Sequence, residues 1–128
     1  MSKSIPKTIT AAFDTLTFKS DRTPQTQDMS AAFCELAPYR DGAVFLAHWA
    51  GERQWEVHRN GDEIVMVLEG ATTISLLENG EERTHSMQAG ELIVVPKDVW
   101  HRFQTPDEVK VLSVTPQPTE HSIATPAE

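Results

Sequence analysis

The chain has 128 residues, a length suited to one domain with a hydrophobic core of its own. Hydrophobic residues make up 39% and charged residues 23%, which is typical of a globular protein and argues against general disorder. Nineteen acidic and eleven basic residues give a net charge of −8, so nucleic acid and anionic membranes are disfavoured as partners.

Cysteine content and hydropathy indicate the cellular setting. Cys34 is the only cysteine, so no internal disulfide can form and nothing points to an oxidising compartment. The longest apolar runs are about five residues, such as 64–68, far too short to span a bilayer. We therefore expect a cytoplasmic protein without a targeting or membrane segment.

The first forty residues give the weakest structural signal. Phe13, Leu16 and Phe18 are spaced to edge a strand, and residues 29–36 fit either a helical turn or a strand. Because this region is extended and apolar in places, we predict that residues 1–40 form an arm packing on the barrel or on a partner.

The remainder of the chain has the pattern of a β protein. Asn79-Gly80 is the strongest hairpin signal, and other glycines and prolines separate the runs. The β-rich runs are 43–49, 56–58, 63–69, 71–77, 82–87, 91–95 and 109–114. This spacing predicts an all-β sandwich or small barrel over residues 41–116. Residues 117–128 are expected to be a loosely ordered, proline-containing tail.

Acidic and imidazole side chains gather at the ends of these runs. Glu56 and His58 are two residues apart, so on a strand they point to the same face. Glu63 opens the next run, and His101 follows a turn that contains Pro96. Two imidazoles and two carboxylates that converge inside an apolar barrel are most simply interpreted as a divalent-metal site.

The spacing of these residues resembles the two short motifs of the cupin superfamily, over about residues 43–115. The first motif corresponds here to Glu56, His58, Glu63 and Gly70, and the second to Gly90, Pro96 and His101. Glu56 stands where the family usually has its first histidine, and Asp98 replaces a glycine of the second motif. The resemblance implies a double-stranded β-helix (jelly-roll) barrel, and it implies a homodimer because small cupins commonly dimerise.

The resemblance also implies a function and a ligand set. We expect a metal-dependent cupin that binds a small organic molecule in its barrel, with dioxygenase and isomerase chemistry both similar to known uses of this fold. The metal would be a divalent first-row ion (Fe, Mn, Zn or Ni) held by Glu56, His58, Glu63 and His101. Glu56 is either a fourth ligand or a general base. The rival hypothesis is a non-catalytic module that binds or senses a small molecule without an essential metal.

A metal-free reading of the same residues remains open. Glu56 and His58 could form a hydrogen-bonded polar pair at the barrel mouth, and Asp62 could point inward in place of Glu63. We expect His48 to pack rather than to line the pocket, and His85 to be exposed. His121 is interpreted as incidental, since it lies in the predicted tail.

Other conspicuous side chains are assigned structural roles. Cys34 has no neighbouring pattern typical of a nucleophile, so a buried, inert thiol is expected. Tyr39 and Arg40 are placed where they could close over the barrel mouth. The tryptophans are expected to be core or interface anchors: Trp49, Trp55 and Trp100.

Overall fold

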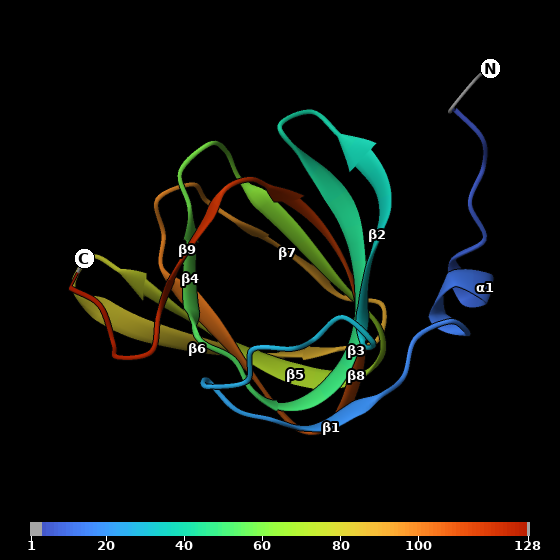
Figure 1. Cartoon of the computed structure of the whole chain (residues 1–128). Helices are drawn as coiled ribbons and strands as arrows, with labels where there is room; N and C mark the ends of the chain where they lie inside the picture. Colours follow the sequence, from blue (N-terminus) through green and yellow to red (C-terminus); the bar gives the residue numbers. More distant parts are fainter. Residues whose placement is uncertain (1–3, 128) are drawn as a thin grey trace.

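The structure is a computed structural model that describes residues 4–127, and nearly all of its regular structure is β (Figure 1). The predicted all-β barrel is confirmed. One short helix, α1 (Ile9–Phe13), precedes the strands. The strands are β1 (Lys19–Arg22), β2 (Phe33–Tyr39), β3 (Gly42–Glu52), β4 (Trp55–His58), β5 (Glu63–Glu78), β6 (Glu81–Gln88), β7 (Leu92–Val95), β8 (His101–Pro116) and β9 (Thr119–Ser122).

The long strands β3, β5 and β8 form the middle of the sheet. β8 pairs antiparallel with β3 on one side and with β5 on the other, from Ile64 opposite Val114 to Leu76 opposite His101. β7 and β6 pair with successive parts of β5. In Figure 1 the strands curve round into a barrel, so that their inner faces are turned toward one another.

Gly70 lies inside one continuous strand. The predicted break between runs 63–69 and 71–77 is therefore wrong, because Gly70 adopts φ +79° within β5 and shifts the register against β8. A glycine at such a bulge bends a strand without ending it. By contrast, the hairpin predicted at Asn79-Gly80 is confirmed. Both residues have positive φ and join β5 to β6, with Glu78 opposite Glu81.

The N-terminal segment packs on the barrel of its own chain. β2 pairs antiparallel with the first part of β3 and β1 pairs parallel with its last part, both on the edge opposite β8. The strand edge expected around Phe13 is wrong, because Phe13 ends the helix α1 and is buried, with Lys110 Nζ 5.4 Å from its ring centroid. Within residues 4–127, no helix has the length and apolarity needed to cross a membrane.

The C-terminal segment contains a strand. The loosely ordered tail expected from residue 117 is wrong for Thr119–Ser122, which pair antiparallel with β4 as β9. An ion pair of 3.0 Å also links Arg59, the residue after β4, to Glu120 of β9. Residues 1–3 of the predicted arm and residue 128 of the predicted tail lie outside the described residues.

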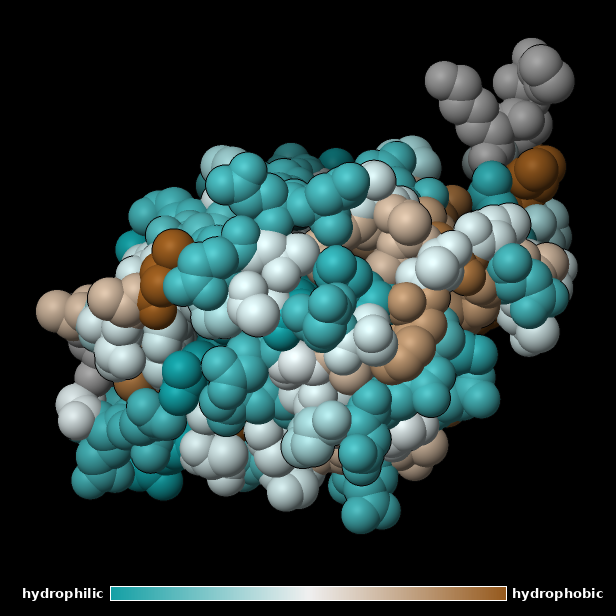
Figure 2. Space-filling view, turned by 60° about the horizontal axis from the view of Figure 1, so that its bottom comes forward, coloured by the Kyte–Doolittle hydropathy of each residue, from teal (hydrophilic) through white to brown (hydrophobic). Residues whose placement is uncertain are grey.

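Apolar side chains on the inner faces form the core beside the central space. The buried cluster comprises Ala47, Trp49, Val65, Val67, Ile74, Leu76, Met87, Val95, Phe103, Val109 and Val111. Hydrophilic colours predominate on the face in Figure 2, and hydrophobic colours gather near the N-terminal segment. The interior thus contains this packed apolar cluster and, beside it, the cavity described next.

Candidate functional site

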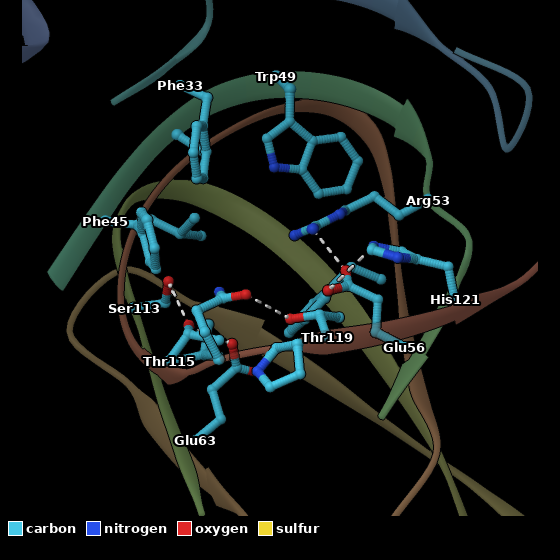
Figure 3. Close-up of a pocket in the computed structure, with 16 residues that line it drawn as sticks. Phe33, Phe45, Trp49, Arg53, Glu56, Glu63, Ser113, Thr115, Thr119 and His121 are labelled. Carbon is cyan, nitrogen blue, oxygen red and sulfur yellow. Dashed lines mark hydrogen bonds and ion pairs between the residues drawn. The ribbon is translucent and has the colours of Figure 1, made fainter. Parts of the chain in front are cut away.

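A cavity of about 350 Å³ lies inside the barrel. Figure 3 shows Phe33 and Phe45 on one side, Arg53, Glu56 and His121 on the opposite side, and Trp49 between them. Ser113, Thr115 and Glu63 lie along another part of the wall. A concave site with an apolar wall and a few polar groups is the usual form of a small-molecule site.

Three buried ligand-type side chains meet beside this cavity. His58 ends β4, Glu63 begins β5 and His101 begins β8. The atoms with which these three side chains could bind an ion all lie within 4.8 Å of one another. Sheet register explains part of this convergence, because residue 101 pairs with Glu56 of β4 and Glu63 pairs with Val95 of β7, the strand that leads into the turn before His101.

Glu63 lies between the two imidazoles. Its Oε1 accepts a hydrogen bond from His101 Nε2 at 3.0 Å, and His58 Nε2 lies 3.3 Å from the same oxygen. Its Oε2 accepts a bond from the Thr115 hydroxyl at 2.6 Å. Both carboxylate oxygens are therefore held, and the Glu63 side chain has a fixed orientation at the cavity wall.

The second ring nitrogen of each imidazole is also bonded. His101 Nδ1 lies 3.0 Å from the Val99 carbonyl, which only accepts, so Nδ1 carries a proton. When the ring is neutral, Nε2 is therefore the nitrogen whose lone pair can bind an ion. His58 Nδ1 lies 3.0 Å from the Thr119 hydroxyl on β9. Partners of this kind orient imidazoles that bind metals.

The buried charges shift two pKa values in opposite directions. Burial alone would raise the pKa of Glu63, but the hydrogen bond from His101 and the charges of both imidazoles lower it well below its usual range. Burial alone would lower the pKa of His101, but the hydrogen bond to Glu63 and its negative charge raise it. Without an ion, the pair is therefore stabilised as carboxylate and imidazolium.

The donor set fits a divalent first-row ion. Two imidazole nitrogens and one carboxylate are ligands that iron, manganese, nickel and zinc accept. Among the described residues, His58 Nε2 has no partner in hydrogen-bond geometry although it is fully buried. An ion bound by the three side chains would give that nitrogen a partner.

Glu56 does not join this cluster. Its Oε1 forms a 2.5 Å ion pair with Arg53 Nη2, and its Oε2 lies 4.0 Å from His121 Nε2 (Figure 3). Of the four predicted ligands, the structure thus brings together His58, Glu63 and His101, and it places Glu56 in the cavity wall. Nothing in the sequence indicates that Arg53 would bind this carboxylate.

His121 is a site residue that the sequence reasoning missed. Its interpretation as incidental is wrong, because β9 carries it to the cavity wall beside Glu56. Thr119 and His121 are two residues apart, so a strand presents both on one face. That alternation was the available signal, although the neighbouring prolines indicated a tail.

The other residues considered from the sequence lie outside the metal cluster. His48 pairs with Glu108 at 2.5 Å and stacks near Phe18, away from the cavity, and His85 is exposed as expected. Asp62 accepts a bond from the Lys97 amide, so Glu63 is the residue that points inward. The cavity wall includes Trp49 but not Trp55, Trp100, Tyr39, Arg40 or Cys34.

Two tryptophans are core residues and Cys34 is partly buried. Trp49 and Trp55 are each 1% exposed, which confirms their role as core anchors. Trp100 is half-buried, with Arg59 over its ring. Burial raises the pKa of the Cys34 thiol, which disfavours the reactive thiolate.

Sequence comparison matches most of this barrel to a known family. The family model for the Cupin domain matches residues 45–115, more than half of the chain. The uncharacterized protein YdbB of Bacillus subtilis (strain 168) is 31% identical over 70 residues, covering 55% of this chain and 59% of that protein. The chain spans less than two thirds of the length of the curated relatives it matches, 59% and 55%.

Solved structures with the same fold include proteins from two bacteria. A cupin-2 domain containing protein from Shewanella frigidimarina is 29% identical, with a TM-score of 0.58 over 67% of this chain and 80% of that chain. Protein NMB1881 from Neisseria meningitidis is 17% identical, with a TM-score of 0.59 over 92% of this chain and all of that one (100%). The second likeness concerns the fold alone.

Proposed function

The chain belongs to the Cupin domain family, with the expected all-β jelly-roll barrel, and from this premise we propose that it is a metal-dependent small cupin. It binds a small organic molecule in the cavity of the barrel. The observation that carries the proposal is that the ligand atoms of buried His58, Glu63 and His101 lie within 4.8 Å of one another, and that Glu63 also lines the cavity.

These three side chains would hold a divalent first-row ion, Fe, Mn, Zn or Ni. When bound, the ion supplies Lewis-acid polarisation or oxygen activation, so a dioxygenase or an isomerase are the reaction classes proposed. Val99 and Thr119 fix the orientation of the imidazoles, and Thr115 fixes Glu63. The chain thus supplies a ligand set whose geometry is held before binding.

Glu56 is proposed as the general base. Its carboxylate lines the same cavity as Glu63, so it is placed to contact the organic ligand. To serve as a metal ligand, it would have to leave the 2.5 Å ion pair with Arg53. Of the two roles predicted for Glu56, metal ligand and general base, the general base is therefore the better supported.

Metal content of purified variants tests the proposal. His58→Ala and His101→Ala should each reduce bound metal to a small fraction of the wild-type stoichiometry, because each removes one of three ligands. His85→Ala is the matched control, since His85 is exposed and remote from the cluster, and it should retain full metal content. Unchanged occupancy by elemental analysis in either of the first two variants would show that the ion site is wrongly assigned.

A second candidate function is a binding or sensing cupin without an essential metal. The observation in its favour is that Glu63 already accepts hydrogen bonds on both oxygens, which satisfies the buried carboxylate with no ion. Ligand binding before and after exhaustive chelation separates the candidates. Affinity that survives chelation unchanged favours the binder, and affinity that falls with metal removal favours the metal-dependent protein.

The protein is also proposed to be a homodimer. Ile64 and Val94 are a cross-strand pair on the outer face of β5 and β7, and Leu92 lies two residues from Val94 on the same face. All three side chains are exposed. Neighbouring exposed apolar residues of this kind are typical of an interface.

A further inference from the structure

The chemistry of the cavity wall restricts the kind of molecule that fits there. The aromatic part of the wall contains Phe33, Phe45, Trp49 and Phe103. Phe33 and Phe45 stack on each other, with ring centroids 5.0 Å apart and an interplanar angle of 24°. Flat aromatic surfaces favour a flat ring as a partner, by offset or edge contacts.

The wall also contains buried hydrogen-bond donors without an acceptor among the described residues. Trp49 is 1% exposed, and its Nε1 has no acceptor among residues 4–127. Arg53 Nε is also buried and unpartnered in that part of the chain, while Arg53 Nη2 is held by Glu56. Buried donors normally have partners, so an oxygen acceptor on a ligand would complete them. Figure 3 shows Trp49 and Arg53 both at the cavity, next to each other.

An acceptor for a ligand hydroxyl lies in the part of the wall that Arg53 and His121 form (Figure 3). Glu56 Oε1 is occupied by Arg53, whereas Oε2 lies 4.0 Å from His121 Nε2, beyond hydrogen-bond distance. A hydroxyl group can both accept from a donor such as Trp49 Nε1 and donate to a carboxylate oxygen. A ketone or ether can accept only, so it would leave the Glu56 oxygen unused.

The cation in the wall beside Trp49 is already paired. Arg53 Nη2 is held by Glu56, so Arg53 is not free to neutralise a carboxylate on a ligand. An anionic group placed here would also meet the Glu56 carboxylate, whereas an uncharged hydroxyl group can donate to it. The volume of about 350 Å³ corresponds to roughly twelve water molecules at ~30 Å³ each, which suits a single-ring molecule.

We propose that the cavity binds a single-ring aromatic compound with an uncharged hydroxyl group, a phenol-type ligand. This inference rests on the proposed function, because it names the class of organic molecule that the barrel takes. The ring lies against the aromatic wall formed by Phe33, Phe45 and Phe103. The hydroxyl group accepts from Trp49 Nε1 and faces the Glu56 carboxylate.

The first test uses 4-methylphenol and ¹⁵N-labelled protein, both as purified and after chelation. The three tryptophans give three indole signals, and the Trp49 signal is identified by its loss in Trp49→Phe. Titration should shift the Trp49 signal and leave the Trp55 signal in place, because Trp55 Nε1 is equally buried and unpartnered but lies outside the cavity. Binding without a shift of the Trp49 signal would overturn the proposal.

The second test compares three relatives of that compound on the wild-type protein. Toluene lacks the hydroxyl group, 4-methylcyclohexanol lacks the aromatic ring, and 4-methylbenzoate carries a charge. Each should bind at least about fivefold more weakly than 4-methylphenol, the ratio expected for one lost hydrogen bond or stacking contact. Equal or tighter binding of any of the three would overturn the proposal.

Two tryptophan variants test whether Trp49 is the residue that donates to the ligand. Trp49→Phe keeps an aromatic ring but removes the donor, so its affinity for 4-methylphenol should fall about fivefold, toward that of toluene. Trp55→Phe is the matched control and should bind like the wild type. If Trp49→Phe does not fold, the ligand series on the wild type still decides the question.

Elemental analysis of the same preparation keeps the two proposals apart. Bound metal without selective binding of 4-methylphenol would overturn the ligand class and leave the metal-dependent cupin standing. Selective binding in protein that holds no metal would support the ligand class and overturn the metal requirement.

Discussion

Thr119 links the last strand to an imidazole of the candidate metal site. Its hydroxyl lies 3.0 Å from His58 Nδ1 and is the partner of that nitrogen within residues 4–127. The bond holds the ring so that Nε2 faces Glu63. Thr119 lies beyond residue 115, where the family match ends.

Replacement of Thr119 should therefore weaken metal binding without removing a ligand. Thr119→Val keeps the shape of the side chain but deletes the hydroxyl, and loss of such an orienting partner typically lowers metal affinity 10–100-fold. Thr119→Ser keeps the hydroxyl and should stay close to wild type. Competition titration with a chromophoric chelator measures both affinities. Equal affinity in the valine and serine variants would show that Thr119 does not orient His58.

The pair of Glu63 and His101 predicts how the stability of the metal-free protein depends on pH. The lowered pKa of Glu63 stabilises the fold above its unfolded value of ~4.3, and this contribution is lost as pH falls below it. The raised pKa of His101 stabilises the fold below ~6.5, and this contribution is lost as pH rises through the raised value. The contribution of the pair is therefore largest between about pH 4.5 and 6.5.

Urea unfolding of chelated protein from pH 4 to 9 measures this profile. The groups facing His101 are Glu63, His58 and the Val99 carbonyl, with the Glu56 charge nearby. His101→Gln should flatten the decline in the free energy of unfolding above pH 6.5, whereas His85→Gln should leave it unchanged. A decline that persists in full in His101→Gln would assign it to another group.

At the scale of a strand, the backbone of β5 at Gly70 leaves no room for a side chain. Its φ is +79°, and a Cβ atom there would lie 2.1 Å from the Glu108 carbonyl oxygen. Gly70→Ala should lower the free energy of unfolding by at least about 2 kcal/mol, from backbone strain and the clash together. Gly61 is the matched control, since a Cβ there meets nothing closer than 3.8 Å.

Gly61→Ala should change the free energy of unfolding by no more than about 0.5 kcal/mol. Urea unfolding of the two variants beside the wild type gives the comparison. Similar losses at both positions would mean that the bulge at Gly70 is not fixed by its backbone conformation.

Gly70 and β9 also show where sequence reasoning fails for this fold. A glycine between two apolar runs looks like a turn, and only the pairing of β5 with β8 reveals a bulge within one strand. β9 is short and lies among prolines, so its strand exists because β4 offers an unpaired edge, a tertiary effect that local propensity does not report. His121 was consequently misread along with the strand that carries it.

The site was more predictable than its surroundings, for a geometric reason. Strand alternation and the spacing of His58, Glu63 and His101 were enough to place those side chains together, since a barrel brings inward faces to one interior. The partner of Glu56 was not predictable. Arg53 is three residues away on a connecting segment, and only the path of the chain between β3 and β4 turns it toward the carboxylate.

At the scale of the whole molecule, the arm predicted to pack on the barrel or on a partner packs on the barrel of its own chain, because β1 and β2 pair with β3. We place the interface of the proposed dimer on another surface. The outer face of β5 and β7 is the candidate, with Ile64, Leu92 and Val94 exposed at 37%, 54% and 51%. A net charge of −8 opposes association of two copies, so apolar contact is required to offset it.

Val94→Glu tests this surface by placing a carboxylate in the middle of the apolar face of each copy. The wild type should elute at twice the chain mass of 14.3 kDa by size-exclusion chromatography with light scattering, and Val94→Glu should elute at the chain mass. Ile123→Glu introduces the same charge at a residue of similar exposure, 56%, on the C-terminal segment, and should remain dimeric. A wild-type protein at the chain mass over all concentrations would contradict the dimer, and a dimeric Val94→Glu would place its interface elsewhere.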